Sequence, residues 1–304
     1  MEKPLVSVII PTYKRPDVLP RSINSILNQS YDNYEIIVVD DNNADSEERK
    51  KTEIVMEQYL DNSKVTYIQH SYNRNGSVAR NTGFCKSKGK YIMFLDDDDE
   101  FFMDKILRQV ECLENRDTTW GACYTGYIRV NRNSKVVAKG VESKEGALLV
   151  EELKRNLFVH AGSNLMVRRC VIEELNGFDE SFLRNQDVEF LVRLLKKYKL
   201  AYVDVLGLIV HVHENVAKVN FIDLTEQYIS KFSDDIESLG ENEKKNIYEM
   251  YSLQRFRYYL FSEKKVVEAF REVHKNRIRF AKVGRYLAYL MYRAITKKVY
   301  GFKG

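Results

Sequence analysis

Four short runs of β-branched and aromatic residues recur in the first third of the chain, roughly 30 residues apart. They are Val6–Ile10, Tyr34–Val39, Val65–Gln69 and Tyr91–Leu95. Such runs are typical of strands that are buried on both faces of a parallel sheet. Between the first two runs, Ile23, Ile26 and Leu27 repeat at helical spacing, which predicts a connecting helix. The alternation of strand and helix predicts an α/β fold with an open, mostly parallel sheet flanked by helices.

Polar residues follow three of these runs at the point where each strand would end. Pro11–Tyr13 follows the first run, Asp40–Asp41 the second and Asp96–Asp99 the fourth. In open parallel sheets, ligands bind beyond the carboxyl ends of the strands, so we expect a sheet of the nucleotide-binding type with its site at this edge. The glycine-rich loop of dinucleotide-binding enzymes is absent, because Pro11–Pro16 stands in its place. A hydride-transfer enzyme is therefore disfavoured.

The run Asp96–Glu100 is the strongest single pattern in the sequence. In an extended segment alternate side chains project to one side, so Asp96 and Asp98 could address the same ligand. Carboxylates suit Mn²⁺ or Mg²⁺, ions that are commonly shared with the phosphates of a ligand. A calcium loop is excluded because Phe101 and Leu107 stand where glycine and glutamate are required. A solvated acidic surface loop is the alternative.

Asp40 and Asp41 allow two interpretations. The pair could form a turn or cap a helix. A carboxylate at the tip of a second strand can also accept hydrogen bonds from a ribose or a base. Hydrolysis of glycosides by paired carboxylates is disfavoured, because such hydrolases have no use for strand ends of the nucleotide-binding type.

The remainder of the chain has a different pattern of predicted secondary structure. Cys123–Val130 and Lys135–Ala138 predict a hairpin, and Ser163–Val167 and Val205–Val210 predict strands. Asp187–Tyr198 has helical spacing. From about residue 220 onward, aromatic and basic helix formers dominate without strand alternation. We therefore expect a helical C-terminal appendage.

Charge is unevenly distributed, although the formal net charge is only +4. Residues 271–304 hold ten Lys or Arg and one acid, whereas the rest of the chain holds 43 acidic and 38 basic side chains. The basic segment also carries one apolar helical stripe, made of Phe280, Val283, Leu287, Leu290 and Ala294. This pattern predicts a helix that either lies on an anionic membrane surface or packs on its own domain. No nucleic-acid-binding module accompanies the basic segment, so nucleic acid is not an expected partner.

Three features of the sequence predict the cellular compartment of the protein. The four cysteines form no CxxC pair, the N-terminus lacks the apolar core of a signal peptide, and no apolar run of about 18 residues could span a bilayer. We expect a cytoplasmic protein, with residues 271–304 available for the inner face of the plasma membrane. The oligomeric state stays open.

Six motifs in consecutive order resemble those of family 2 glycosyltransferases with the GT-A fold. They are Val6–Tyr13, Glu35–Asp41, Asn75–Gly83, Tyr91–Asp99, Asn176–Glu180 and Asn185–Asp187. The resemblance covers about residues 4–215. It implies a GT-A domain over 1–217, with a nucleotide-sugar-binding half (1–115) and an acceptor half (116–217), before a helical region over 218–304.

The resemblance also implies roles for individual residues. Pro11, Thr12, Tyr13 and Asp41 would lie near the base and ribose, and Arg80 near the diphosphate or sugar. Asp97 would lie near the ribose, and Asp98 would hold the metal that bridges the diphosphate, with Asp96 nearby. Gly76 would let the backbone approach a ligand, although a turn glycine is the simpler interpretation.

Asp187 is the candidate general base of an inverting reaction, in which a carboxylate takes the proton of the acceptor hydroxyl. The family usually shows two adjacent acids here, whereas this chain has Gln186 before Asp187. Glu189 is a competitor, but its position on a helix points it away from Asp187. The alternative role for Asp187 is a first-turn acid favoured by the helix dipole.

Histidines offer one further site residue. His213 follows the predicted strand Val205–Val210 and, by the resemblance, could complete the metal or diphosphate site, with His211 a weaker candidate. His70, His160 and His274 are interpreted as structural.

These expectations combine into one function. The sequence predicts an inverting, metal-dependent glycosyltransferase that moves a hexose-type sugar from a nucleotide sugar, most plausibly UDP-linked, to a glycan or lipid-linked oligosaccharide. A catalytically silent nucleotide-sugar-binding or scaffold protein is the alternative that Gln186 keeps open. A nucleotidyltransferase is a third, and it would release pyrophosphate. The sugar, the acceptor and the linkage are not specified, because acceptor pockets come from the variable region near residues 120–185.

Overall fold

The computed structural model describes residues 3–182, 184–212 and 221–304. The chain divides into two compact units. The first consists of Met1–Leu148 and Val159–Val212, and the second of Leu149–Phe158 and His213–Gly304.

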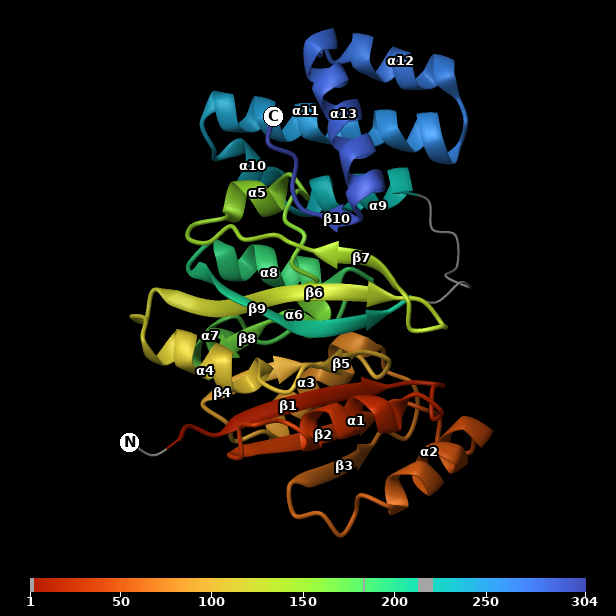
Figure 1. Cartoon of the computed structure of the whole chain (residues 1–304), viewed down its shortest axis with the longest axis vertical. Helices are drawn as coiled ribbons and strands as arrows, with labels where there is room; N and C mark the ends of the chain where they lie inside the picture. Colours follow the sequence, from red (N-terminus) through yellow and green to blue (C-terminus); the bar gives the residue numbers. More distant parts are fainter. Residues whose placement is uncertain (1–2, 183, 213–220) are drawn as a thin grey trace. The chain divides into compact units, whose positions relative to one another are not determined.

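A parallel sheet forms the N-terminal half of the first unit (Figure 1). Its strands are β1 (Val6–Thr12), β2 (Tyr34–Asp40), β3 (Val65–Gln69) and β4 (Tyr91–Phe94), in the spatial order β4-β1-β2-β3. Every side chain from Val6 to Ile10 is buried, as the apolar run predicted. The helices between the strands are α1 (Leu19–Leu27), α2 (Glu47–Glu57) and α3 (Gly76–Lys86). The predicted α/β architecture is confirmed.

Local sequence explains where these helices begin. Pro20 lies in the first turn of α1, where its missing N–H costs nothing. Ser46 caps α2 by accepting a hydrogen bond from the backbone N–H of Arg49 at 3.2 Å. Asn75 caps α3 in the same way, accepting from the N–H groups of Ser77 and Val78. These caps fix the loops that follow β2 and β3.

The part of the first unit that follows β4 extends the sheet with antiparallel pairs. Its elements are β5 (Glu100–Phe101), α4 (Lys105–Glu114), β6 (Trp120–Val130), β7 (Val136–Gly140), α6 (Ala161–Asn164), β8 (Met166–Arg168), α7 (Arg169–Glu174), α8 (Gln186–Leu195) and β9 (Lys199–His211). β8 pairs antiparallel with both β4 and β6, and β6 also pairs parallel with β9. The predicted β6–β7 hairpin is present.

One predicted strand is wrong in its position. Ser163–Val167 was expected to be a strand, but Ser163 and Asn164 end the short helix α6, and β8 begins only at Met166. The buried Asn164 amide donates to the carbonyls of Thr125 and Val159 at 2.7 and 2.8 Å. Because these side-chain bonds satisfy neighbouring backbone groups, the segment can turn instead of extending.

The second unit is helical, as predicted. It contains α5 (Leu149–Leu153), α9 (Phe221–Lys231), α10 (Ser233–Glu237), α11 (Glu241–Arg257), the π-helical segment η1 (Tyr258–Ser262), α12 (Val266–Lys275), α13 (Phe280–Thr296) and the short β10 (Lys298–Val299). Phe256, Val273, Val283 and Tyr286 belong to its core. None of the helices in the described ranges has the length and apolar character that crossing a bilayer requires.

The apolar stripe of α13 is only partly used in packing. Val283 is buried and Leu287 and Leu290 pack partly against the core, whereas Phe280 is 74% exposed. Tyr286, which lies outside the predicted stripe, is fully buried. The helix therefore packs on its own unit through one face and leaves apolar side chains in water on another.

Candidate active site

A pocket of about 380 Å³ lies at the carboxyl ends of the parallel strands of the first unit. Seven of the predicted site residues line it: Pro11, Thr12, Tyr13, Asp41, Arg80, Asp96 and Asp97. Arg15, Asn73, Asn75, Gly76 and Ala79 complete the lining. The structure thus brings together residues that come from the ends of β1, β2 and β4 and from α3.

The acidic run behind β4 is a turn. The expectation that Asp96 and Asp98 alternate along an extended segment is wrong, because the N–H of Asp99 donates to the carbonyl of Asp96 at 3.1 Å and closes the chain on itself. The turn nevertheless gathers carboxylates. Oxygens of Asp96, Asp98 and Asp99 lie within 4.8 Å of one another, which is close enough for all three to address one ion. Three hard oxygen donors fit Mn²⁺ or Mg²⁺.

Asp97 points away from that cluster and toward β1. Its Oδ2 accepts a hydrogen bond from the Thr12 hydroxyl at 2.8 Å, and its Oδ1 lies 3.2 Å from the Arg15 guanidinium. Burial raises the pKa of Asp97 to about 7, opposed by the charge of Arg15. The side chain therefore links the first and fourth strand ends at the floor of the pocket.

Arg15 is a site residue that the sequence analysis did not select. Its guanidinium also pairs with the carboxylate of Asp98, and the side chain is half-exposed. The pattern that could have identified it is the basic pair Lys14–Arg15 in the loop after the first strand. Arg15 therefore places a positive charge against the acidic run. Five adjacent acids repel one another, and this charge offsets part of that repulsion.

Arg80 approaches the acidic turn from α3. Its Nη2 lies 2.6 Å from Asp96 Oδ1. Gly76 allows this approach, because a Cβ there would lie 2.9 Å from Arg80 Nη1 and 3.1 Å from Gln186 Nε2. The neutral amide of Gln186 therefore lies beside the guanidinium of Arg80, at the position where related enzymes usually carry an acid.

Asp187 lies in the first turn of α8. A Cβ placed on Gly162 would be 3.4 Å from Asp96 Oδ2 and 3.6 Å from Asp187 Oδ2, so both carboxylates lie beside this glycine. Glu189, the competitor, is 1% exposed and pairs with Arg193 at 2.7 Å. The geometry leaves Asp187, rather than Glu189, on the side of the acidic turn.

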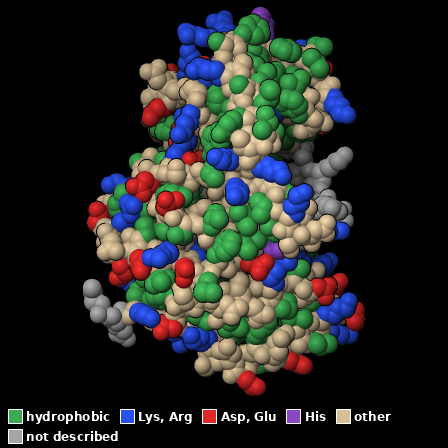
Figure 2. All heavy atoms as spheres, viewed as in Figure 1, with side chains coloured by type: hydrophobic (Ala, Val, Ile, Leu, Met, Phe, Trp, Pro, Cys, Tyr) green, Lys and Arg blue, Asp and Glu red, His purple; other side chains and the backbone are tan. Residues whose placement is uncertain are grey.

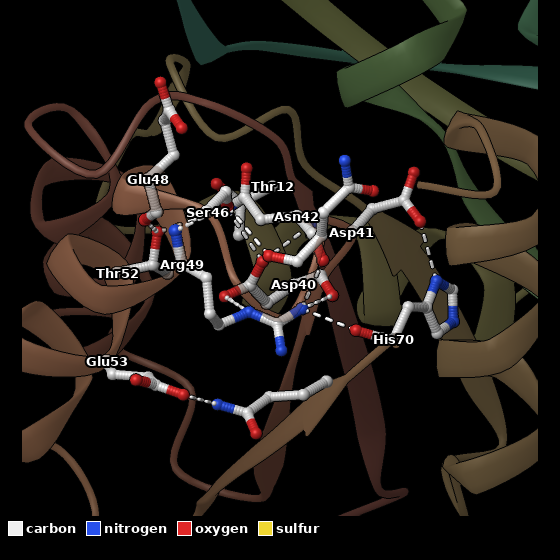
Figure 3. A network of polar contacts seen from close by, with 12 residues as sticks. Thr12, Asp40, Asp41, Asn42, Ser46, Glu48, Arg49, Thr52, Glu53 and His70 are labelled. Atoms are coloured by element: carbon white, nitrogen blue, oxygen red, sulfur yellow. Dashed lines mark hydrogen bonds and ion pairs between the residues drawn. The ribbon is translucent and has the colours of Figure 1, made fainter. Parts of the chain in front are cut away.

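The two acids behind β2 have different environments (Figure 3). Asp40 is completely buried and pairs with Arg49 at 2.9 Å, so its role is structural. Asp41 Oδ1 lies 2.7 Å from His70 Nδ1, and Asp41 Oδ2 accepts from the Asn73 amide at 2.7 Å. These contacts hold Asp41 at the wall of the pocket.

Two histidines contact the acidic run Asp96–Glu100. His160 Nε2 lies 3.3 Å from Asp99 Oδ2. Burial acts to lower the pKa of His160, but the hydrogen bond and charge of Asp99 outweigh it and raise that pKa. His211 Nε2 lies 2.6 Å from Glu100 Oε1. His213, the predicted metal ligand, lies outside the described residues.

Comparison with known proteins decides the family. The sequence profile described as Glycosyl transferase family 2 matches residues 7–175, more than half of the chain. The chain belongs to glycosyltransferase family 2. The matched range includes β1, α3, β4 and the acidic turn, and it ends before Asp187.

Relatives of the family 2 chain include enzymes of bacterial surface polymers. It is 30% identical over 204 residues to the putative teichuronic acid biosynthesis glycosyltransferase TuaG of Bacillus subtilis, covering 66% of this chain and 75% of the relative. It is 26% identical over 204 residues to WfgD of Escherichia coli, a UDP-Glc:alpha-D-GlcNAc-diphosphoundecaprenol beta-1,3-glucosyltransferase, covering 67% of this chain and 75% of the relative.

The fold of this family 2 chain is GT-A. The crystal structure of S. aureus TarS 1-349 in complex with UDP-GlcNAc superposes with a TM-score of 0.62, covering 96% of this chain and 87% of that one, at 17% sequence identity. At that identity the likeness concerns the fold.

Proposed function

We propose that this family 2 glycosyltransferase is an inverting, metal-dependent enzyme that moves a hexose-type sugar from a UDP-linked donor to a glycan or lipid-linked oligosaccharide. The observation that supports the proposal is that Asp96 and Asp187 come together beside Gly162. Asp96 belongs to the acidic turn at the donor pocket, and the carboxylates of Asp96 and Asp187 both lie within 3.6 Å of the Cβ position of Gly162.

On the donor side, Pro11, Thr12, Tyr13, Asp41 and Asp97 would contact the base and ribose, and Arg80 the diphosphate or the sugar. The pocket of about 380 Å³ has the size of a small-ligand site. Asp98, with Asp96 and Asp99, would hold Mn²⁺ or Mg²⁺. When bound, such an ion stabilises the negative charge that develops on a departing diphosphate.

On the acceptor side, Asp187 would act as the general base. The acceptor oxygen forms a bond to the anomeric carbon, the bond from that carbon to the diphosphate oxygen breaks with its electron pair, and the hydroxyl proton passes to Asp187. Attack from the face opposite the diphosphate inverts the anomeric configuration. The Oδ2 atoms of Asp96 and Asp187 both lie within 3.6 Å of the Cβ position of Gly162, so the reacting sugar would bind beside this glycine.

The relatives support an acceptor in polysaccharide biosynthesis. WfgD is named for a diphosphoundecaprenol acceptor and a UDP-glucose donor, and TuaG for teichuronic acid. We extend that class of acceptor to this chain. A lipid-linked acceptor would lie at a membrane, where the basic residues 271–304 could meet an anionic surface.

The test is release of UDP from a panel of UDP-sugars in the presence of Mn²⁺, with and without saccharide acceptors. Wild type should release UDP only with metal, and Asp187→Asn should lose roughly 10²–10⁴-fold in rate while keeping its affinity for UDP. Asp223→Asn is a matched control, because Asp223 is also a first-turn aspartate but lies on α9, outside the pocket lining.

Two results would favour the other functions. If wild type binds UDP but never releases it from any sugar donor, the protein is a nucleotide-sugar-binding or scaffold protein. If pyrophosphate appears instead of UDP, it is a nucleotidyltransferase.

A further inference from the structure

The second unit contains an apolar cavity that the proposed reaction does not use. It has a volume of about 640 Å³ and lies between η1 and α13. Its apolar lining consists of Leu260, Phe261, Leu287, Leu290, Met291 and Ala294. Arg257 is the one charged residue among those that line it. A cavity of this size and character suits a hydrocarbon chain far better than a sugar or a nucleotide.

The rim of the cavity exposes further apolar side chains to water. Phe261 is 59% exposed, Met291 is 65% exposed, and Ile295, one helical turn beyond Met291, is 77% exposed. Figure 2 shows hydrophobic side chains gathered on the visible face of this unit. A cluster of exposed apolar groups around an apolar hollow marks an interaction surface rather than ordinary solvent-facing residues.

The backbone at the rim is unusual. Leu260, Phe261 and Ser262 belong to η1, where the chain leaves α-helical geometry for a π-helical turn. Such turns are uncommon and frequently accompany functional sites. Here the widened turn carries Phe261, whose ring stays largely in water.

Charge around the cavity identifies the kind of partner. The segment from Arg277 to Gly304 contains eight Lys or Arg and no Asp or Glu. Lys297 and Lys298, which directly follow the last turn of α13, are exposed, and Arg257 lines the cavity itself. Basic side chains beside an apolar face are what an anionic bilayer surface attracts. A second copy of this chain is disfavoured as the occupant, because a symmetric interface would bring this basic segment close to its own equivalent.

We propose that the cavity between η1 and α13 receives an acyl chain of an anionic membrane phospholipid, while Arg257 and the exposed basic residues of the C-terminal segment contact its headgroup and those of its neighbours. The second unit thereby docks on a membrane surface without crossing it. This inference deepens the membrane contact suggested above, but it does not rest on sugar transfer and would stand if the protein transferred no sugar.

Vesicle flotation with the full chain tests the proposal. Wild type should float with vesicles of phosphatidylcholine and phosphatidylglycerol and should not float with phosphatidylcholine alone. Ile295→Asp should weaken binding to the mixed vesicles roughly tenfold or more, because a charge replaces an inserted apolar side chain. Ile54→Asp is the matched control. Ile54 is 66% exposed on α2 of the first unit, and its substitution should leave binding within about twofold.

A second measurement separates insertion from surface attraction. Phe261→Trp in a Trp120→Phe background gives one tryptophan at the rim, since Trp120 is the chain's single tryptophan. Its fluorescence should shift to the blue on mixed vesicles and should be quenched by phospholipids with brominated acyl chains. Circular dichroism of each variant confirms that it is folded.

Three results would overturn the inference. The first is wild type that does not bind the mixed vesicles. The second is binding that Ile295→Asp leaves unchanged and that brominated chains do not quench, which would indicate attraction to headgroups alone. The third is wild-type dimers that Ile295→Asp converts to monomers without any effect on vesicle binding, which would make this face an interface between copies.

Discussion

The guanidinium of Arg15 lies 3.2 Å from the Asp97 carboxylate and also pairs with Asp98, so a protein cation occupies the acidic turn. The Arg15 side chain is 49% exposed. It can therefore swing into solvent at little cost, whereas the carboxylates are held by the turn. A divalent ion that binds Asp98 must compete with this contact.

Substitution Arg15→Gln should consequently tighten Mn²⁺ binding in the absence of nucleotide. Removing the half-exposed positive charge of Arg15 beside the Asp98 carboxylate should lower the dissociation constant roughly fivefold, an effect that high salt reduces. Isothermal titration with Mn²⁺ measures it. Lys14→Gln is the matched control, because Lys14 stacks over the Tyr13 ring and is the adjacent basic residue. Equal effects in both variants would show that general charge, and not the Arg15 contact, sets the affinity.

The Cβ position of Gly162 lies close to both Asp96 and Asp187, so the missing side chain leaves a space beside the two carboxylates. An alanine methyl would lie 3.4 and 3.6 Å from their Oδ2 atoms, which is ordinary van der Waals contact. Gly162→Ala should therefore fold normally. It should nevertheless lower the transfer rate roughly 10²-fold, since the methyl occupies the volume that a reacting sugar needs.

The measurement for Gly162→Ala is the transfer rate together with UDP affinity, which should change less than about twofold. Gly284→Ala is the control, because nothing lies within 4 Å of a Cβ built on this helical glycine of α13. An unchanged transfer rate in Gly162→Ala would place the reaction elsewhere.

The sequence predicted the elements whose signals are local. β1, β2 and β4 are short apolar runs buried on both faces, and such runs leave little ambiguity. The expected burial of β3 is wrong, because β3 is the edge strand of the sheet and its five residues are half-buried or exposed. The predicted strands also fix where each strand ends. The residues at those ends include the pocket residues Thr12, Asp41 and Asp97. Topology alone brings them together, because parallel strands share one carboxyl edge.

Long-range contacts explain what the sequence could not predict. His160 reaches Asp99 across 61 positions of the chain, and no local pattern marks it. The turn at Asp96–Asp99 is closed by a backbone hydrogen bond that any sequence could make. Asn164 reads as part of a strand, but its side chain bonds to Thr125, 39 positions away. At His160 and Asn164, tertiary contacts override the local preference, whereas the turn depends on a local backbone bond that no residue pattern marks.

Substitution of Asp by Asn should reduce mainly stability at Asp40 and mainly UDP affinity at Asp41. Asp40→Asn breaks a buried ion pair with Arg49 and leaves that charge unpaired, so the free energy of unfolding should fall by about 3–5 kcal/mol. Asp41→Asn keeps a polar group at the pocket wall but removes its charge, so UDP affinity should fall roughly tenfold with a smaller loss of stability. Denaturant unfolding and UDP titration of both variants check this. Reversed results would exchange the two roles.

Lys105 makes the stability of the first unit depend on pH. Its ammonium group is buried and donates to Asn164 Oδ1 at 2.6 Å and to Thr125 Oγ1 at 3.2 Å. It forms no salt bridge with a carboxylate in the described part of the chain. Burial lowers the pKa of Lys105 to about 7 from its ordinary value of 10.5. Between these two values the unfolded chain binds more protons at this residue than the folded protein does. The free energy of unfolding therefore rises with pH across this window, and below pH 7 the full cost of the buried charge is present.

Substitution Lys105→Met should remove that dependence. Relative to the variant, wild type should gain about 1 kcal/mol of stability per pH unit between about pH 7 and 9. Denaturant unfolding at several pH values measures the slope, which is more diagnostic than the absolute stability, because the variant also loses hydrogen bonds to Asn164. Lys51→Met, exposed on α2, is the control and should keep the wild-type slope. Parallel slopes for wild type and Lys105→Met would show that the buried amine stays protonated across this range, as it does in the unfolded chain, and that its oxygen acceptors hold the charged form.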